Sequence, residues 1–211
     1  MAHAFDSVCG RCRRAGEKLF LKGEKCFTPK CPIVRRPYAP GVHGQSRSGG
    51  SGRGSDYGKQ LREKQALRAM YGLRDRQLKK YYREALQKRG VTAEALLERL
   101  ESRLDNSVYR LGYGASRAHA RQLVNHGLFT VNGRRVDIPS YQVRVGDVIA
   151  VKETKRGKPV FLGLQERLVN KDLPPWLTRV DLYTGTVAAT PTLEVHEIPV
   201  DMQAIVEFYS R

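Results

Sequence analysis

All four cysteines of the chain lie within residues 9–31, in the stretch CGRCRRAGEKLFLKGEKCFTPKC. Cys9 and Cys12 form a C-x2-C pair, and after thirteen intervening residues Cys26 and Cys31 form a C-x4-C pair. Two close pairs joined by a short loop are typical of a tetrahedral Zn(II) site, in which each pair chelates from one tight turn. Four thiolates leave no open coordination position, so the spacing predicts one structural zinc ion and no catalytic one.

Other chemistry stays open for these cysteines. The same four thiolates could hold an iron–sulfur cluster. Two disulfides are a second alternative, which a cytosolic address disfavours, and the N-terminal segment has no secretory signal pattern. A thioredoxin-like redox pair is a third, but no strand is predicted before the first pair and no helical pattern after it. The arginines and lysines around the cysteines favour thiolates and would offset the charge of a four-thiolate zinc centre.

Charge is the strongest global signal in the 211 residues, whose formal net charge is +17. Residues 1–171 carry 36 of the 38 Lys and Arg residues, whereas residues 172–211 carry 6 acidic residues and 2 basic ones. A positive excess of this size indicates a polyanionic partner, most simply nucleic acid. No apolar run approaches the roughly 20 residues that a membrane helix needs, so no membrane partner is expected.

Residues 32–55 are rich in proline, glycine, serine and arginine and predict an irregular basic arm. The arm is either a disordered tether or a segment that becomes ordered when its cations meet RNA phosphates. The candidate RNA-binding residues of the arm are Arg35, Arg36, Tyr38, Arg47 and Arg53.

Three amphipathic helices are predicted after the arm. The first is capped by Asp56 and runs to about Tyr71, the second is capped by Asp75 and ends at Gly90, and the third is capped by Thr92. Their apolar stripes are those of core-facing helices. The first helix supplies candidate RNA-binding residues, namely Tyr57, Lys59, Arg62, Lys64 and Arg68.

Residues 105–151 predict a compact module of two helices followed by a small antiparallel sheet. A short helix comes first, and a second helix follows with Ser116 as N-cap and Gly127 as its stop. Asn132-Gly133 is a strong hairpin signal between two short strands, and a turn at residues 146–147 leads into another strand. The fold class predicted for the chain is therefore α+β, with a mostly helical lobe and an N-terminal zinc knuckle beside this module.

The module offers several donors to a nucleic acid. The free N–H groups at the start of the Ser116 helix favour a phosphate. Arg117 and Arg121 are four residues apart and are expected to project from the outer face of that helix. The remaining candidates could meet phosphates, backbone or 2′-OH groups, and they are Asn125, His126, Asn132, Arg134 and Arg135.

Several stretches of the sequence resemble known protein families. SRAHARQLVNHGLFTVNGRRVDIPSYQVRVGDVIAV, residues 116–151, resembles the S-four RNA-binding domain. The stretches CGRC…CFTPKC, RRPYAPGVHGQ, SDYGKQLREKQALRAMYG, LESRLDNSVYRLGY and IVEFYSR resemble, in order, the family of bacterial small-subunit ribosomal protein four. The cysteines match its zinc-containing branch.

This resemblance implies a function. The chain is expected to be a non-enzymatic constituent of the cytoplasmic small ribosomal subunit and a primary binder of the five-prime domain of its rRNA. It would nucleate assembly of the subunit body and influence translational accuracy through contacts with neighbouring ribosomal proteins. No small-molecule substrate and no homo-oligomer are expected. The expected division is a zinc knuckle and basic arm in residues 1–45, a helical rRNA-binding lobe in residues 46–104 completed by part of residues 165–211, and an S-four domain in residues 105–165.

Two rival functions are less well supported by the residues. An RNA-modifying enzyme would need a catalytic domain, and residues 152–211 are short and contain no nucleophile–base pair. A zinc-finger DNA-binding regulator would need a recognition helix with side chains that read base edges. The acidic residues 172–211 are expected to pack internally or to meet a basic protein, with Trp176 as a core anchor.

Overall fold

The computed structural model describes residues 7–42, 44, 55–169, 171–191 and 198–211. The chain divides into two compact units, each treated separately below. Unit 1 comprises Met1–Ala93 and Glu194–Arg211, and unit 2 comprises Glu94–Leu193. Within the described residues, no helix is long and apolar enough to cross a membrane.

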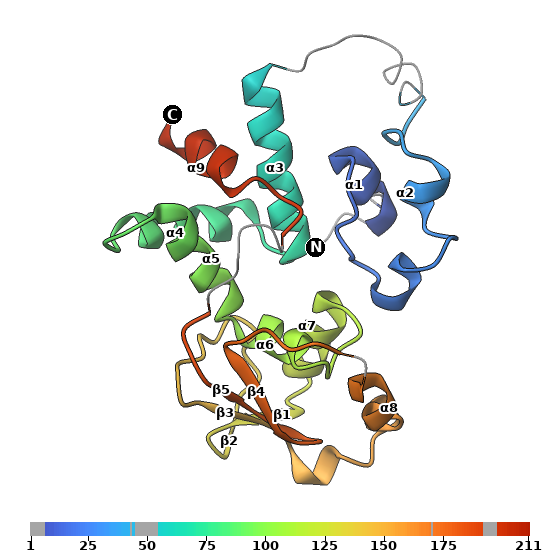
Figure 1. The fold of residues 1–211 in the computed structure, drawn as a ribbon, viewed down its shortest axis with the longest axis vertical. Coiled ribbons are helices and arrows are strands. Elements are labelled where there is room, and N and C mark those ends of the chain that lie inside the picture. Colours follow the sequence, from blue (N-terminus) through green and yellow to red (C-terminus); the bar gives the residue numbers. More distant parts are fainter. Residues whose placement is uncertain (1–6, 43, 45–54, 170, 192–197) are drawn as a thin grey trace. The chain divides into compact units, whose positions relative to one another are not determined.

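Unit 1 is helical. Its elements are α1 (Val8–Ala15), η1 (Gly23–Cys26), α2 (Pro32–Arg35), α3 (Asp56–Met70), α4 (Asp75–Leu86) and α9 (Met202–Ser210), and α5 (Thr92–Glu101) begins at its boundary. The C-terminal helix α9 packs against α3 and α4, far from it in sequence (Figure 1). Aromatic contacts hold α9 there: the Tyr57 and Phe208 ring centroids are 5.6 Å apart, and those of Tyr82 and Tyr209 are 4.8 Å apart.

The starts of α3 and α4 differ from the predicted ones by one residue. Ser55 is the N-cap of α3, and its hydroxyl accepts a hydrogen bond from the Gly58 N–H at 3.2 Å. Asp56 and Asp75 lie in the first turns instead, where a carboxylate interacts favourably with the helix dipole. Helix α4 ends at Leu86, four residues before the expected stop at Gly90.

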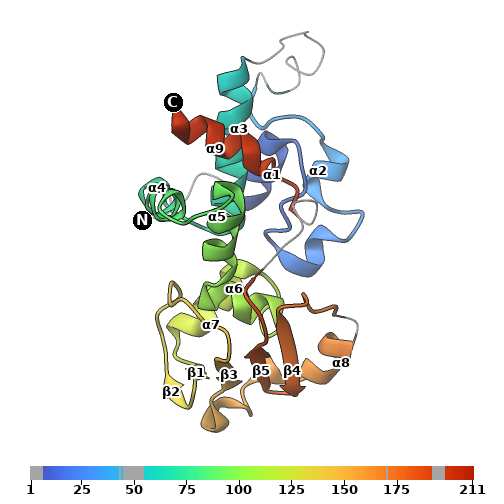
Figure 2. The ribbon, with the colours of Figure 1, turned by 60° about the vertical axis from the view of Figure 1, so that its left-hand side comes forward.

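Unit 2 combines helices with one antiparallel sheet, so the α+β class is confirmed. Its elements after α5 are α6 (Leu104–Arg110), α7 (Arg117–Asn125), β1 (Phe129–Val131), β2 (Arg134–Arg135), β3 (Val148–Val151), η3 (Glu153–Lys155), η4 (Pro159–Phe161), α8 (Leu164–Val169), β4 (Leu177–Asp181) and β5 (Thr184–Val187). The strand order is β2-β1-β3-β5-β4, and the strand labels in Figure 2 follow this order from left to right, with α6 and α7 above them and α8 to the right.

The hairpin between β1 and β2 forms where the sequence predicted it. Asn132 and Gly133 both adopt positive φ, 50° and 77°, as a tight two-residue hairpin requires. Strands β4 and β5 extend the sheet beyond the predicted module, because β5 pairs with β3. Trp176, 1% exposed, lies in the core of this unit, which agrees with its predicted role as an anchor.

Candidate nucleic-acid interface and cysteine cluster

The cysteines lie on three short elements at the start of unit 1. Cys9 and Cys12 are on α1, which the sequence did not predict as a helix, Cys26 ends η1, and Cys31 precedes α2. Helix α1 is defined by its caps: the Ser7 hydroxyl accepts a hydrogen bond from the Gly10 N–H at 3.1 Å, and a left-handed glycine follows its last residue.

All four thiols are free, and all but Cys9 are buried. The Lys22 N–H donates to the Cys26 sulfur at 3.3 Å. Burial raises the pKa of Cys12, and the charges of the other three cysteines raise it further. The raised pKa favours the neutral thiol, so zinc would have to displace a proton from Cys12, but four sulfur atoms are a donor set that suits zinc. However, no three or more His, Cys, Asp or Glu side chains of the described residues are arranged as a metal-ligand group, so the zinc knuckle stays a prediction.

The basic arm is tied to α1 by a residue that the sequence did not single out. The Arg13 guanidinium donates to the Arg36 and Tyr38 carbonyl oxygens, at 3.1 and 2.9 Å, and lies 4.8 Å from the centroid of the Tyr38 ring. Arg35 and Arg36 are exposed, whereas one face of Tyr38 is covered by this contact. The other two arm candidates, Arg47 and Arg53, lie outside the described residues.

Four of the five candidates on α3 reach the surface, and Lys64 does not. Lys64 is 6% exposed; its ammonium group lies 2.8 Å from the Asp75 carboxylate and 4.5 Å from the centroid of the Phe208 ring. The expectation that it lies on a free basic face is therefore wrong, because it joins α3 to α4 and α9. Tyr57 is half exposed, and Lys59 is exposed at 3.8 Å from Asp56.

The start of α7 is built as the sequence predicted. The Ser116 hydroxyl accepts a hydrogen bond from the His119 N–H at 3.2 Å, and the first turn contains no acidic residue. Burial lowers the pKa of His119, and the charge of Arg167 lowers it further, so the neutral imidazole is favoured near this helix start. The helix therefore presents its positive dipole end without a neighbouring carboxylate in its own first turn.

Arg117 and Arg121 do not project freely from α7, contrary to expectation. The Arg117 Nε donates to the Asn106 side-chain oxygen at 2.9 Å, and its guanidinium lies over the Tyr109 ring. The Arg121 guanidinium contacts the Asp105 carboxylate at 2.7 Å. Both side chains are mostly covered, because α6 packs along α7 and supplies these partners.

Two buried carboxylates organise this region. Glu101, whose side chain is fully buried, pairs with Arg110 at 2.9 Å and accepts from the Asn106 amide at 2.8 Å. Asp105 pairs with the buried Arg103 through two hydrogen bonds of 3.0 and 2.8 Å. Sequence reasoning missed both carboxylates. The available signal was their position among the leucines of α5 and α6, because leucines at helical spacing face the core and a carboxylate between them faces it too.

Four predicted residues at the end of α7 and in the hairpin are exposed, and one of the two hairpin residues reaches the helix end. Asn125 and His126 end α7 and are exposed. Arg134 and Arg135 are also exposed, and the Arg135 guanidinium lies against Gly127, directly after the helix. Arg135 therefore lies beside Asn125 and His126 at the end of α7, whereas Arg134 precedes it in β2 and points to the opposite face.

The Asn132 side chain makes two hydrogen bonds within the protein. Its amide donates to Asp147 at 2.8 Å, and its side-chain oxygen accepts from the Val148 N–H at 2.9 Å. Both polar groups of the side chain thus join the hairpin to the turn before β3. The exposed amide keeps a second N–H and a second lone pair, so an RNA contact by Asn132 stays a prediction.

A cation that the sequence did not single out lies at the end of α6. The Lys171 ammonium donates to the Tyr109 carbonyl oxygen at 2.7 Å and lies 4.6 Å from the centroid of the Tyr109 ring. Burial, and then the charges of Arg110, Arg117 and two further arginines, lower its pKa to about 8. Only tertiary structure brings these cations together.

Comparisons with known proteins cover both units. The family model for the ribosomal protein S4/S9 N-terminal domain matches residues 5–101, and the model for the S4 domain matches residues 102–149. Proteins named small ribosomal subunit protein uS4 from Solidesulfovibrio magneticus, Ruminiclostridium cellulolyticum and Pelotomaculum thermopropionicum are 51%, 50% and 52% identical to the chain. Each alignment covers all of both proteins. The chain belongs to the uS4 family.

Within the uS4 chain, the S4 domain match corresponds to α6, α7 and the sheet up to the start of β3. Strands β4 and β5 lie beyond the match in sequence, yet they complete the same sheet. The buried Glu101 ends one match and Asp105 lies in the other, so the carboxylate network joins the segments that the two family models divide.

Proposed function

We propose that the chain is a structural constituent of the small ribosomal subunit that binds small-subunit rRNA directly. The observation that carries this proposal is identity of about 50% over the whole length with proteins named small ribosomal subunit protein uS4. Those names describe a subunit component and no reaction, which supports a structural role for this chain and its place in the cytoplasmic ribosome. The S4 domain match adds an RNA-binding module.

The finer role rests on the sequence resemblance. The chain would bind the five-prime domain of the rRNA, nucleate assembly of the subunit body, and act on translational accuracy through neighbouring ribosomal proteins. The charge distribution supports a direct RNA contact, because the net charge of +17 is concentrated before residue 172. The exposed side chains of Asn125, His126 and Arg135 at the end of α7 offer phosphate and 2′-OH contacts, and the exposed Arg134 offers another on the opposite face of β2.

We also propose that Cys9, Cys12, Cys26 and Cys31 hold one structural Zn(II). Free thiols on three neighbouring short elements supply four soft donors of the type that zinc prefers. When bound, the metal would supply a fixed cross-link among α1, η1 and α2, which are too short to form a core alone. An iron–sulfur cluster is the alternative for the same donors.

Two measurements test these proposals. Binding of folded small-subunit rRNA should exceed binding of duplex DNA at one fixed salt concentration; equal affinity would favour a DNA-binding regulator. With about ten phosphate contacts, affinity should fall on the order of 10³–10⁵-fold between 50 and 200 mM salt. Elemental analysis should give one zinc per chain, lost in Cys12→Ser; iron, or no metal in the wild type, would refute the zinc site.

A further inference from the structure

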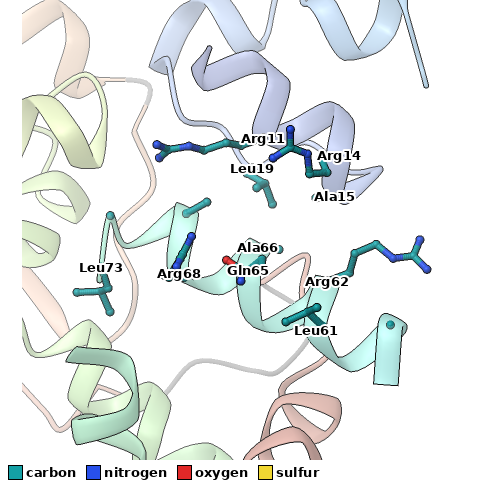
Figure 3. A pocket seen from close by; sticks show the side chains of 13 residues that line it. Arg11, Arg14, Ala15, Leu19, Leu61, Arg62, Gln65, Ala66, Arg68 and Leu73 are labelled. Atoms are coloured by element: carbon teal, nitrogen blue, oxygen red, sulfur yellow. The ribbon is translucent and has the colours of Figure 1, made fainter. Parts of the chain in front are cut away.

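A cavity of about 460 Å³ lies between α1 and α3, within unit 1. Its apolar lining includes Ala15, Leu19 and Leu61, and Gln65 adds an amide. Four arginines also line it: Arg11, Arg14, Arg62 and Arg68. Figure 3 shows Arg11 and Arg62 at opposite ends of the cavity, with Leu19 between α1 and α3.

Three of these four arginines, Arg11, Arg62 and Arg68, have no ion pair among the described residues. Arg14 makes an interaction of its own, and Arg62 also lines a neighbouring hollow that contains Glu17 and Glu63. Like charges gathered around a hollow repel one another, and an anion held between them removes that repulsion. Guanidinium groups bind phosphate through paired hydrogen bonds and also stack on flat rings. The rim therefore suits a ligand that carries both a phosphate and a planar ring.

We propose that this cavity receives one unstacked nucleotide of the RNA that the chain binds. This inference rests on the proposed function and specifies a subsite for it. The volume falls in the usual range for pockets that take small ligands, roughly 300–1,000 Å³. Proteins commonly recognise RNA at loops and bulges, where a base turned out of the stack packs on arginine planes or apolar side chains. In this cavity the leucines would contact the base, Gln65 its polar edge, and the arginines the flanking phosphates.

The test separates filling the cavity from removing its charge. Ala69 lines the cavity near the end of α3, and Ala69→Leu would occupy space without changing charge. It should lower the affinity for folded small-subunit rRNA on the order of 10-fold, with the slope of log K against log salt unchanged. Arg62→Gln should instead make that slope shallower by about one phosphate contact. Ala93→Leu, at a partly buried helical alanine outside the cavity lining, should match the wild type.

Chemical probing of the bases gives the second readout. One or two adjacent nucleotides should be protected by the wild type and by Ala93→Leu, but not by Ala69→Leu. If thermal unfolding shows that Ala69→Leu is not folded, Ala15→Leu fills the cavity from the α1 side.

Identical affinity and identical protection in a folded, filled variant would overturn the inference and leave the proposed function intact. Binding of an oligoglutamate peptide that Ala69→Leu abolishes would also overturn it by assigning another occupant. Failure of the wild type to bind rRNA would overturn both.

Discussion

Replacement of Glu101 by glutamine tests whether the buried carboxylates hold unit 2 together. The Glu101 side chain is fully buried and accepts hydrogen bonds from Arg110 at 2.9 and 3.2 Å and from Asn106 at 2.8 Å. Arg117 lies 3.8 Å away. Glutamine keeps the shape of the side chain but removes its charge, so two guanidinium groups would lose their shared counter-ion.

The expected loss can be worked from this geometry. Breaking a buried ion pair by removing one partner destabilises a protein by about 3–5 kcal/mol. The Arg110 and Arg117 side chains keep 20% and 14% of their exposure, so water would screen part of the remaining positive charge. We therefore expect Glu101→Gln to lower the free energy of unfolding by about 2–4 kcal/mol. For a unit of this size, that loss corresponds to a drop in Tm of roughly 10–25 °C.

Urea and thermal unfolding followed by circular dichroism would measure this effect. Glu153→Gln is the matched control, because Glu153 is 86% exposed and lies 4.0 Å from Arg156. An exposed pair of this kind contributes about 0–1 kcal/mol, so the control should unfold almost as the wild type does. A loss below about 1 kcal/mol for Glu101→Gln, or an equal loss in the control, would refute the reasoning.

Three further predictions concern unit 2. Gly114→Ala should destabilise it by about 1–3 kcal/mol, because the new Cβ would lie 2.9 Å from the backbone of α7, whereas Gly157→Ala meets no atom within 4 Å and should be near neutral. Equal urea midpoints would contradict this. Ser116→Ala should lose about 1 kcal/mol in the same assay, unless the His119 N–H finds another acceptor. The pKa of Lys171 is lowered to about 8 in the folded protein, so between pH 8 and 10.5 the Lys171 amine stays protonated only in the unfolded chain. The contribution of Lys171 to the free energy of unfolding should therefore rise over this range, by at most roughly 3 kcal/mol. Lys171→Met should remove that rise in urea titrations.

Local signals in the sequence were sufficient wherever one short segment determines the structure. Asn132-Gly133 specifies the hairpin because few other residue pairs tolerate two positive φ angles in succession. Ser116 specifies the start of α7 because its hydroxyl satisfies an N–H group of the first turn. The one-residue error at α3 has the same local origin, since Ser55 and Asp56 are both good caps and only one can occupy the position.

Local sequence signals could not identify the partners that tertiary structure brings together. Lys64 and Arg121 occupy helix positions that suit an exposed cation, and each has its carboxylate on another element. The pairing of β5 with β3 joins segments more than thirty residues apart, and the short strand at Thr184–Val187 carries little apolar signal. The cavity between α1 and α3 requires helix α1, which was not predicted because the cysteine spacing was interpreted as a metal-binding turn.

The two sets of arginines near α7 must be tested in different ways. Arg121→Ala would remove one of the partners of Asp105, a carboxylate buried to 6% exposure, so it should lower stability together with any loss of RNA affinity. Arg135 is exposed, and its ion pair with Asp137 at 3.3 Å is a surface pair, so Arg135→Ala should leave the unfolding midpoint almost unchanged. A specific contact by Arg135 should then appear as a loss of about 1–3 kcal/mol in rRNA binding alone. If Arg135→Ala binds rRNA as the wild type does, the exposed surface at the end of α7 is not the contact that we propose, however strongly Arg121→Ala weakens binding.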